Sequence, residues 1–222
     1  MQAHLPHSPA AAPNQVLRLL YFNLGFWRQR RLRAILGAAG YRLAFGPLAR
    51  AGDAVVVWGK SPTAHRGEAF AAKHGLPIIR IEDAFVRSAR LGRAGDAPLG
   101  LLIDPHGVHF DFSRPSMLEQ ILAKDPLDDA QLLARAKAGI ARLRALDISK
   151  YNMHDPALAP PKAGYVLVID QTRGDASIAH SGADAARFAE MLKAARDDHP
   201  SARILIKTHP ETLQGYRLGH FG

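Results

Sequence analysis

Three short polar clusters each follow a run of apolar residues, and their side chains are of the kinds that move protons and bind anions. They read RIEDAFVRS at residues 80–88, DQTRGDAS at 170–177 and IKTHPE at 206–211. Carboxylates such as those of Glu82, Asp83 and Asp175 can act as general acids, bases or nucleophiles. A lysine and a histidine at the end of a strand, as at Lys207 and His209, suit a phosphate. Together the clusters indicate a site for an anionic ligand.

Each cluster alone also has an ordinary structural explanation. The first fits a salt-bridged strand end, the second an Asx-type turn and the third a plain loop. In open α/β sheets, however, ligands bind just beyond the carboxyl ends of the strands. Three such clusters on consecutive elements would face one another across a cleft between two domains. Gly174, which permits close approach of the backbone to a ligand, is consistent with that arrangement.

The sequence lacks the motifs of common nucleotide-binding and metal-binding sites. No G-x-G-x-x-G follows a strand, and no G-x-x-x-x-G-K-[ST] occurs. His106 and His109 lie three residues apart without an H-E-x-x-H or a facial triad around them, so we predict no metal site. The absence of cysteine excludes disulfides and thiolate metal sites.

The elements that must position the clusters alternate between short apolar strands and helical patterns, which is typical of a parallel α/β fold. Strands are expected at residues 16–23, 54–59, 77–82, 99–104, 165–169 and 203–207. Ser61 and Pro62 predict the start of a helix and Gly75 predicts its end. Ser116 and Glu119 have the spacing of a capping box that opens another helix.

The chain divides into two predicted domains. A long helix that begins near Asp129 closes a first domain of residues 16–148, and the proline-rich residues 149–164 indicate a linker. Residues 165–222 form a partial second domain. Because two strands and one helix cannot cover both faces of a parallel sheet, this unit either borrows a partner's surface or is the front part of something longer. Residues 1–15 are expected to be a disordered leader.

The net charge of +9 favours an acidic partner, which can be nucleic acid, an anionic membrane or an anionic small substrate. The most basic segment, FWRQRRLRAIL at 26–36, predicts an amphipathic helix whose basic face contacts either water or a membrane surface. Its mixture of aromatic and basic residues does not recur, which disfavours nucleic acid. No stretch reaches the roughly 18–20 apolar residues of a membrane span, and residues 1–15 lack the basic-then-apolar layout of a secretory signal, so a soluble intracellular protein is expected.

Seven segments occur in an order that is specific although no single segment is. They are VVVWGKSP, LPIIRIEDAFVRS, PLGLLIDPHGVHFD, RPSMLEQIL, SKYN, VLVIDQTRGDASI and ILIKTHPE. In this order they resemble the capsule polysaccharide biosynthesis proteins of KpsC type, which are Kdo transferases of Gram-negative bacteria. The resemblance runs from about residue 54 to the C-terminus.

The resemblance implies a glycosyltransferase with a GT-B-like arrangement, in which two Rossmann-like domains face each other across a cleft. Its donor would be CMP-β-Kdo and its acceptor an anionic, lipid-linked Kdo glycolipid, so that a β-Kdo linkage of the capsule's poly-Kdo linker is formed. The expected location is cytoplasmic and peripheral at the inner membrane, alongside the machinery of capsule assembly and export. Neither a metal nor another cofactor is expected.

The family's motifs map onto the polar clusters. The essential aspartate of its Q-T-x-x-D motif is Asp175, and its K-x-H-P motif, which holds the CMP portion, is Lys207, His209 and Pro210. Ala84 stands where the family has a glycine in E-D-G-F, so this turn is expected to avoid positive φ. Because modules of the family continue past the His-Pro pair, we expect the chain to be a truncated first module.

Roles follow from the chemistry that the resemblance implies. Departure of CMP would build positive charge at the anomeric carbon, and Asp175 would stabilise or trap it with retention of configuration. Arg173 is expected to lower the pKa of Asp175, and Glu82 or Asp83 to act as the base for the acceptor hydroxyl. Arg80 and Arg87 would bind the carboxylate of Kdo, which a guanidinium matches bidentately. The predicted substrate-binding residues are Arg80, Arg87, Gln171, Arg173, Gly174, Ser177, Lys207, His209 and Pro210.

Two alternatives stay open at this point. The chain can be an inactive, truncated remnant of such an enzyme, in which case it does not bind CMP in calorimetric titration. A basic α/β module that binds nucleic acid instead predicts affinity for DNA or RNA that falls steeply with salt.

Overall fold

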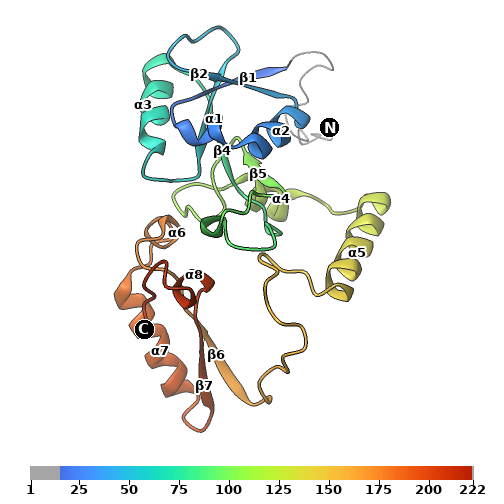
Figure 1. Ribbon diagram of the computed structural model, residues 1–222, viewed down its shortest axis with the longest axis vertical. Coiled ribbons are helices and arrows are strands. Elements are labelled where there is room, and N and C mark those ends of the chain that lie inside the picture. The colour runs from blue at the N-terminus through green and yellow to red at the C-terminus, as the bar shows by residue number, and fades with distance from the viewer. Residues whose placement is uncertain (1–15, 222) are drawn as a thin grey trace.

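The computed structural model describes residues 16–221, which form two α/β units joined by an irregular segment (Figure 1). The predicted leader, residues 1–15, lies outside the described residues, as does Gly222. The first unit occupies the upper part of Figure 1 and the second unit the lower part. No helix within residues 16–221 is long and apolar enough to cross a membrane.

The first unit is built on a five-stranded sheet with the strand order β2-β1-β3-β4-β5. Its strands are β1 (Leu17–Tyr21), β2 (Tyr41–Phe45), β3 (Ala54–Trp58), β4 (Ile78–Asp83) and β5 (Leu101–Asp104). The first four strands are parallel, and β5 pairs with β4 in the antiparallel direction. The carboxyl ends of β1 to β4 therefore lie at one edge of the sheet, where Glu82 and Asp83 end β4.

Helices cover both faces of this sheet. On one face, α1 (Leu24–Arg28) and α2 (Arg30–Ala38) supply Phe26, Leu32 and Leu36 to a core with Leu19, Val56 and Ile81. On the other face, α3 (Ala64–His74) packs its alanines against a core that contains Leu20, Val55 and Val57. Sheet strands that are buried on both sides explain the nearly unbroken apolar runs of β1 and β3.

Two features of the sheet differ from the sequence-based expectation. The short strand β2 was not predicted, because its sequence YRLAF carries Arg42 and lacks a continuous apolar run. The strand β5 was predicted, but the parallel direction expected of an α/β sheet is wrong for it. The connection from β4 to β5 holds only the 3₁₀ turn η1 (Gly92–Ala94) and no helix long enough to cross the sheet, which is what a parallel connection normally requires.

Several predicted helix ends are confirmed. Ser116 forms a full capping box with Glu119 at the start of α4 (Met117–Lys124). Asp129 caps α5 (Ala130–Ala145), and Gly75 ends α3 in the left-handed conformation. The predicted cap at Ser61 is wrong. The helix starts three residues later at Ala64, because residues 61–63 form a turn in which the Ala64 N–H donates to the Ser61 carbonyl at 2.9 Å.

The basic segment at 26–36 forms two helices rather than one. The chain is extended at Gln29, with φ −86° and ψ 96°, and this break separates α1 from α2. Phe26, Leu32 and Leu36 are buried as an amphipathic helix would place them, but Trp27 is 58% exposed. The break therefore turns the face of α1 that carries Trp27 away from the core.

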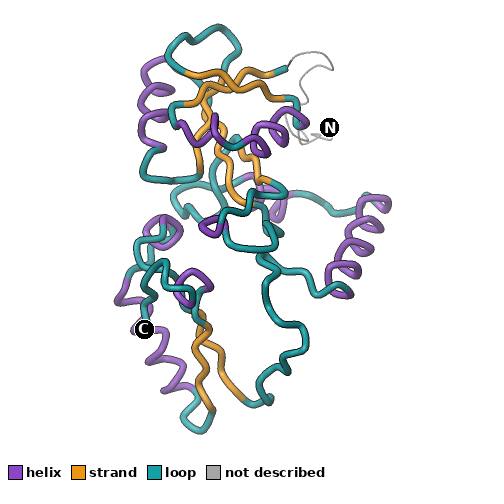
Figure 2. Tube along the Cα trace, in the orientation of Figure 1, coloured by secondary structure: helices purple, strands orange, loops and turns teal. Residues whose placement is uncertain are grey.

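The helix α5 stands apart from the sheet (Figures 1 and 2), and none of its residues is buried. Beyond it, residues 149–152 are not part of a free linker, because they pair with the loop after β4. Tyr151 forms a β-bridge with Ser88, and the Asn152 side chain donates to the Ser88 carbonyl at 3.0 Å. Only the residues after this pairing run free of regular structure to residue 164, as Figure 2 shows.

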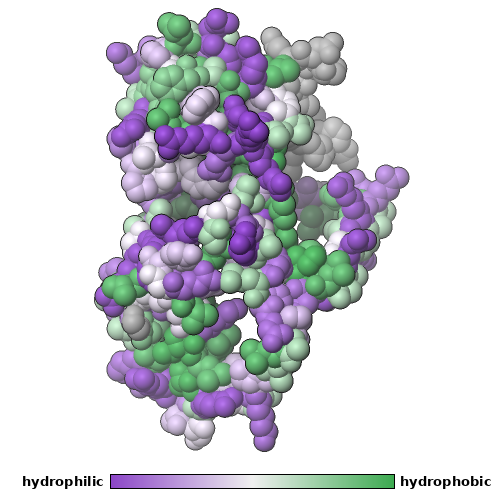
Figure 3. Space-filling model, viewed as in Figure 1, coloured by the Kyte–Doolittle hydropathy of each residue, from purple (hydrophilic) through white to green (hydrophobic). Residues whose placement is uncertain are grey.

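The second unit has a two-stranded parallel sheet of β6 (Tyr165–Ile169) and β7 (Arg203–Lys207). Its helices are α6 (Ala176–His180), α7 (Ala185–Asp198) and α8 (Pro210–Leu213), and Phe188 of α7 and Val168 of β6 are buried. Leu167 and Ile169, on the other face, are 46% and 52% exposed. Figure 3 shows hydrophobic surface over the region of β6 and β7, so one face of this sheet is uncovered.

Candidate active site

The carboxyl end of β6 is held by a network centred on Asp170, which is 4% exposed. Its Oδ1 accepts hydrogen bonds from the N–H groups of Gln171 at 2.8 Å and His220 at 2.9 Å. Thr172 is 1% exposed and forms a β-bridge with Gly219. These contacts fix the chain around residues 217–220 to the end of the strand, so residues 42 or more positions apart meet at one place.

Asp175 is fixed in orientation by hydrogen bonds to both of its oxygens. Its Oδ1 caps α6 and accepts from the Ser177 N–H at 2.9 Å and the Ser177 hydroxyl at 2.6 Å. Its Oδ2 lies 3.2 Å from the guanidinium of Arg217. Although burial favours the protonated form, the Ser177 hydrogen bonds and the charge of Arg217 hold the pKa of Asp175 below its ordinary value. The carboxylate is therefore ionised at neutral pH.

The predicted role of Arg173 in this pKa is wrong. Its carbonyl accepts a hydrogen bond from Arg217 at 2.6 Å, but it is the guanidinium of Arg217 that reaches the Asp175 carboxylate. Gly174 has φ +69°, a left-handed conformation that glycine adopts at little cost. The turn thereby directs Asp175 toward residues 217–220, where Arg217 contacts it. The Asx-type turn considered from the sequence is real, and it is also what orients this carboxylate.

His209 caps the short helix α8, which has Pro210 at its first position as the sequence indicated. Its Nδ1 accepts from the Glu211 N–H at 3.1 Å. Because Nδ1 is an acceptor, the neutral ring carries its proton on Nε2. Burial lowers the pKa of His209, with the nearby charge of Lys150 acting in the same direction and Glu211 and Asp175 opposing it. The ring is therefore a neutral donor at physiological pH.

On the first unit, Glu82 has a strongly raised pKa. Its Oε1 accepts from the indole N–H of Trp58 at 2.8 Å, and it borders a cavity of about 200 Å³ together with His109. Gly59 lies so close that a Cβ there would stand 2.2 Å from Glu82 Oε2. Burial, with a contribution from the charge of Asp83, raises the pKa of Glu82 to about 7, against the effect of its hydrogen bonds.

Asp83, Arg80 and Arg87 make contacts within the first unit. Asp83 Oδ2 accepts from Arg87 Nε at 2.7 Å, while its Oδ1 is buried without a hydrogen-bond partner among the described residues. Arg80 donates to the Gly59 carbonyl and to Glu68, both at 2.6 Å. Arg80 is thus used to hold the end of β3 against α3, and the salt-bridged strand end considered from the sequence describes it well. Ala84 is not among the described residues with positive φ, as its side chain requires.

The two units meet at Tyr151 and Lys150. Burial raises the pKa of the Tyr151 phenol, and the charges of Asp83 from the first unit and of Glu211 and Asp175 from the second add to this rise. The charge of Lys150 acts on Glu82 and His109 of the first unit and on His209 of the second. One short segment is therefore within electrostatic reach of the candidate carboxylates and histidine of both units.

Direct contacts also join the units around this segment. Arg93 forms an ion pair with Glu211 at 3.1 Å, and the Phe112 N–H donates to the His180 carbonyl at 3.0 Å. These contacts bring Glu211 of the third cluster and the end of α6, which follows the second cluster, against the first unit. That all three clusters face one cleft stays a prediction.

The remaining predicted residues differ in their surroundings. Gln171 accepts from the Thr172 N–H at 2.8 Å and helps to shape the strand end. Lys207 is exposed, pairs in register with Ile169, and makes no side-chain hydrogen bond or ion pair within residues 16–221. Its proposed contact with a phosphate stays a prediction. Lys150, rather than Lys207, is the lysine whose charge is felt by His209.

Three residues of the site were not singled out from the sequence. Lys150 and Tyr151 were assigned to the linker, although they belong to the SKYN segment of the resemblance, which was the signal that could have found them. Arg217 lies 42 residues from Asp175, in a segment without a motif, and no local sequence pattern predicts their pairing. Within residues 16–221, no group of three or more histidine and acidic side chains is arranged to hold a metal ion.

Comparison with known proteins identifies the family. The sequence model described as "Capsule polysaccharide biosynthesis protein" matches residues 53–156 and 128–221. The chain belongs to this family. It is 42% identical over 175 residues to the capsule polysaccharide modification protein LipA of Neisseria meningitidis serogroup B, covering 76% of this chain. It is 32% identical over 170 residues to the lipopolysaccharide-processing protein LpsZ of Rhizobium meliloti. The chain spans 25% of the length of that LipA and 38% of that LpsZ.

Solved structures support the same relationship. The β Kdo 2,4 transferase of KpsC from Thermosulfurimonas dismutans superposes with a TM-score of 0.81 and 31% identity, covering 93% of this chain and 64% of that one. The β Kdo 2,7 transferase of the same protein shares the fold, with a TM-score of 0.56. These matches confirm the predicted resemblance and the α/β fold with mainly parallel sheets.

Proposed function

We propose that this family member takes part in capsule assembly as a retaining glycosyltransferase, which transfers Kdo from CMP-β-Kdo to an anionic, lipid-linked Kdo acceptor. The observation that carries the proposal is that the two units are in contact beside the candidate residues: Arg93 pairs with Glu211, and the charges of Asp83 and Asp175 both act on Tyr151. The similarity to a Kdo transferase supports the identity of the sugar. The two units would then act as the halves of a GT-B-like cleft at the cytoplasmic face of the inner membrane.

In this proposal the second unit binds the CMP portion. His209, protonated on Nε2, donates a hydrogen bond to a phosphate oxygen, and the ammonium group of Lys150 adds positive charge near it. Pro210 fixes the start of α8 and so the direction of the ring. A monophosphate leaving group carries less charge than a diphosphate, so these groups and Lys207 are sufficient counter-charges in the proposed reaction.

Asp175 is the proposed nucleophile. Its carboxylate, held ionised by Ser177 and Arg217, attacks the anomeric carbon while the bond from that carbon to the phosphate oxygen breaks and CMP leaves. The acceptor hydroxyl then attacks the same carbon, loses its proton to a base and displaces the carboxylate of Asp175. Two successive displacements retain the configuration of the sugar.

Of the two carboxylates proposed as that base, the surroundings favour Glu82. A pKa of about 7 is close to the value that makes a general base most effective at neutral pH. Asp83 Oδ1 is buried and Oδ2 accepts a hydrogen bond from Arg87, so this carboxylate is already engaged within the first unit. Asp83 is better suited to a positioning role, in which it orients Arg87.

The test is a transfer assay from CMP-β-Kdo with the purified protein and two aspartate variants. Asp175→Asn keeps an oxygen that can cap α6, so the fold should persist, but the product should decrease at least about a thousandfold. Asp184→Asn is the matched control, because Asp184 caps α7 in the same unit by accepting from the Arg187 N–H. It should retain activity within about twofold. Undiminished transfer by the Asp175 variant would contradict the proposal.

A further inference from the structure

Positive charge is concentrated in the first quarter of the sequence. Residues 1–52 contain seven arginines and neither aspartate nor glutamate, and the first carboxylate is that of Asp53. Four exposed arginines cluster at the junction of α1 and α2, at positions 28, 30, 31 and 33. None of the four forms an ion pair or a side-chain hydrogen bond within the described part of the chain. Their charge is therefore available to a ligand.

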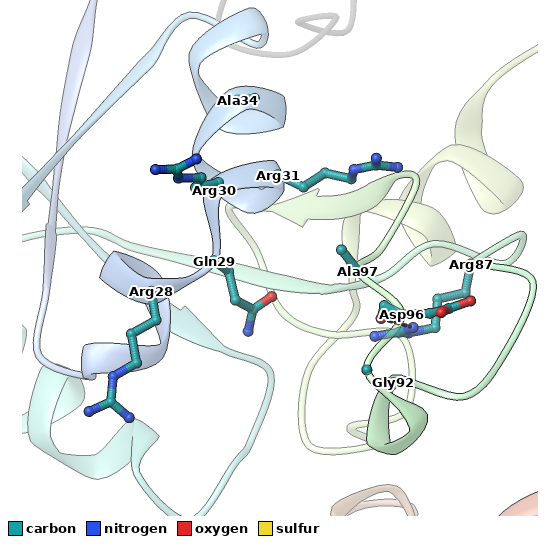
Figure 4. A pocket seen from close by; sticks show the side chains of 10 residues that line it. Arg28, Gln29, Arg30, Arg31, Ala34, Arg87, Gly92, Asp96 and Ala97 are labelled. Carbon is teal, nitrogen blue, oxygen red and sulfur yellow. Dashed lines mark hydrogen bonds between the residues drawn. The ribbon is translucent and has the colours of Figure 1, made fainter.

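Three of these arginines border a cavity of about 800 Å³, a volume large enough for a sugar ligand. Arg28, Arg30 and Arg31 leave the chain in different directions around the extended residue Gln29 (Figure 4). Across from them lies the loop of residues 92–97. In this view Arg31 points toward that loop, whereas Arg28 and Arg30 point away from it, although all three border the cavity.

Arg87 contributes a buried donor to the same cavity. It is 8% exposed, and its Nε and Nη1 donate to Asp83, Ser88 and the Asp96 carbonyl. Its Nη2 has no hydrogen-bond partner among the described residues. Gly92 lets the loop pass beside it, because a Cβ at this position would stand 2.5 Å from Nη2. A guanidinium group of N–H donors thus remains available at the wall of the cavity.

The other charges on the wall do not cancel this positive potential. Asp96 borders the cavity, but its carboxylate accepts three hydrogen bonds from Arg90, through the backbone N–H, Nε and Nη2. The start of α2 also borders it, and Gln29 makes no side-chain cap there, so the first N–H groups of the helix have no capping partner. Arginines, free N–H groups and an already neutralised acid together favour an oxyanion.

We infer that this cavity binds the acidic group of the acceptor, an oxyanion attached to a polyhydroxylated molecule. The identity of the ligand rests on the proposed function, whereas the oxyanion site rests on the side chains alone. Arg87 connects the two sites, because its Nε holds Asp83, the residue next to the proposed base Glu82. Two parts of the acceptor have the required chemistry: the carboxylate of a sugar acid and the phosphate of a lipid headgroup.

Calorimetric titration of the chain with three small probes tests the inference. The probes are the methyl glycoside of Kdo, the uncharged methyl ester of that glycoside, and glycerol 3-phosphate. At least one charged probe should bind saturably, and the ester at least about tenfold more weakly than the glycoside if the sugar acid is the ligand. The charged probe that binds more tightly identifies the part of the acceptor that the cavity holds.

Two double variants with equal changes in net charge distinguish binding in the cavity from general attraction by the positive charge of the protein. Arg30→Gln combined with Arg31→Gln should weaken the charged probe at least about tenfold. Arg33→Gln combined with Arg42→Gln removes the same two charges from exposed positions that do not border the cavity, and should change the affinity less than about threefold. Binding of neither charged probe, or equal weakening by the two double variants, would overturn the inference.

The proposed function is tested separately by titrating CMP into the same proteins. CMP should bind equally well to the chain and to the Arg30/Arg31 double variant, since its proposed contacts lie on the second unit. Binding of a charged probe without binding of CMP would leave the oxyanion site standing and contradict the proposed function. Binding of CMP without binding of either charged probe would support the proposed function and overturn the inference of an oxyanion site.

Discussion

In the first unit, helices cover both faces of a five-stranded sheet, whereas the two-stranded sheet of the second unit has one open face. Leu19, Leu36, Val55 and Ile81 of the first unit are at most 1% exposed. In the second unit Leu167 and Ile169 are about half exposed, and the most buried side chains include those of Asp170 and Thr172. The first unit is held by apolar packing, and the second is ordered to a large extent by polar contacts at its strand ends.

This difference matters for the site because each unit supplies part of it. The carboxylate of Glu82 sits on a rigid, packed strand, and burial raises its pKa. The carboxylate of Asp175 sits in a polar network, and its hydrogen bonds lower its pKa. Two carboxylates with opposite shifts suit opposite roles, one as a base near pH 7 and the other as an ionised nucleophile.

The largest expected effect contrasts apolar truncations in the two sheets. Ile81→Ala in β4 should reduce the free energy of unfolding by about 3–4 kcal/mol, because the buried side chain leaves a cavity. Leu167→Ala in β6 removes a side chain that is 46% exposed and should cost less than about 1 kcal/mol. Urea denaturation of both variants measures the difference. Equal losses would show that the open face of the second unit is covered in solution.

The pH dependence of stability should reveal the raised pKa of Glu82. Because its folded pKa of about 7 exceeds the ordinary value of 4.5, the stability associated with its protonated form is complete below pH 4.5 and lost as the pH rises through 7. The loss amounts to at most about 3 kcal/mol at pH 8.

Glu82→Gln keeps an acceptor for the Trp58 indole but cannot ionise. This variant should match the wild-type protein at pH 4 and exceed it in stability at pH 8, as measured by urea denaturation at both values. The lowered pKa of Asp175 contributes stability that is present near neutral pH and lost as the pH falls. Asp175→Asn should therefore be less stable than the wild-type protein near neutral pH, and this difference should shrink as the pH falls. A parallel pH dependence of Glu82→Gln and wild type would contradict the assignment.

The polar network of the second unit is expected to have an intermediate effect. Asp170→Ala leaves the N–H groups of Gln171 and His220 without their acceptor and should cost about 2 kcal/mol. Hydrogen exchange should become faster at these amides and leave the β3 amides of the first unit unchanged. Asp198→Ala, at the exposed end of α7, is the matched control. Unchanged exchange at the His220 amide would show that residues 217–220 are held in place by other contacts.

The smallest expected effect is at the junction between the units. The ion pair of Arg93 with Glu211 has an arginine that is 55% exposed, so Arg93→Gln should cost less than about 1 kcal/mol and less still at high salt. The measurement is urea denaturation at low and high salt. A larger loss would mean that this pair is essential to the docking of the two units.

Local patterns in the sequence predicted the parts of the fold that local physics decides. The apolar runs of β1, β3, β4, β6 and β7, the capping box at Ser116 and the left-handed end at Gly75 follow from residues close in sequence. The break at Gln29, the direction of β5 and the short β2 depend on what each segment packs against. No nearby residue specifies them.

The candidate site divides in the same way. Asp175, His209 and Glu82 were predicted because each lies in a recognisable cluster at the end of a strand. The partner that lowers the pKa of Asp175 was misassigned to Arg173, since the true partner, Arg217, comes from a distant part of the chain. Lys150 and Tyr151 were missed because the proline-rich residues after them made the whole segment resemble a linker.

The central claim is that side chains of both units form one site for a CMP-linked sugar. Calorimetric titration of CMP tests it most directly, with His209→Ala in the second unit, Lys150→Gln at the junction, and Lys162→Gln as an exposed control from the connecting segment. The account predicts saturable binding of one CMP per chain, at least about tenfold weaker in the first two variants and unchanged in the third. Absence of saturable binding, or equal affinity in all four proteins, would contradict it.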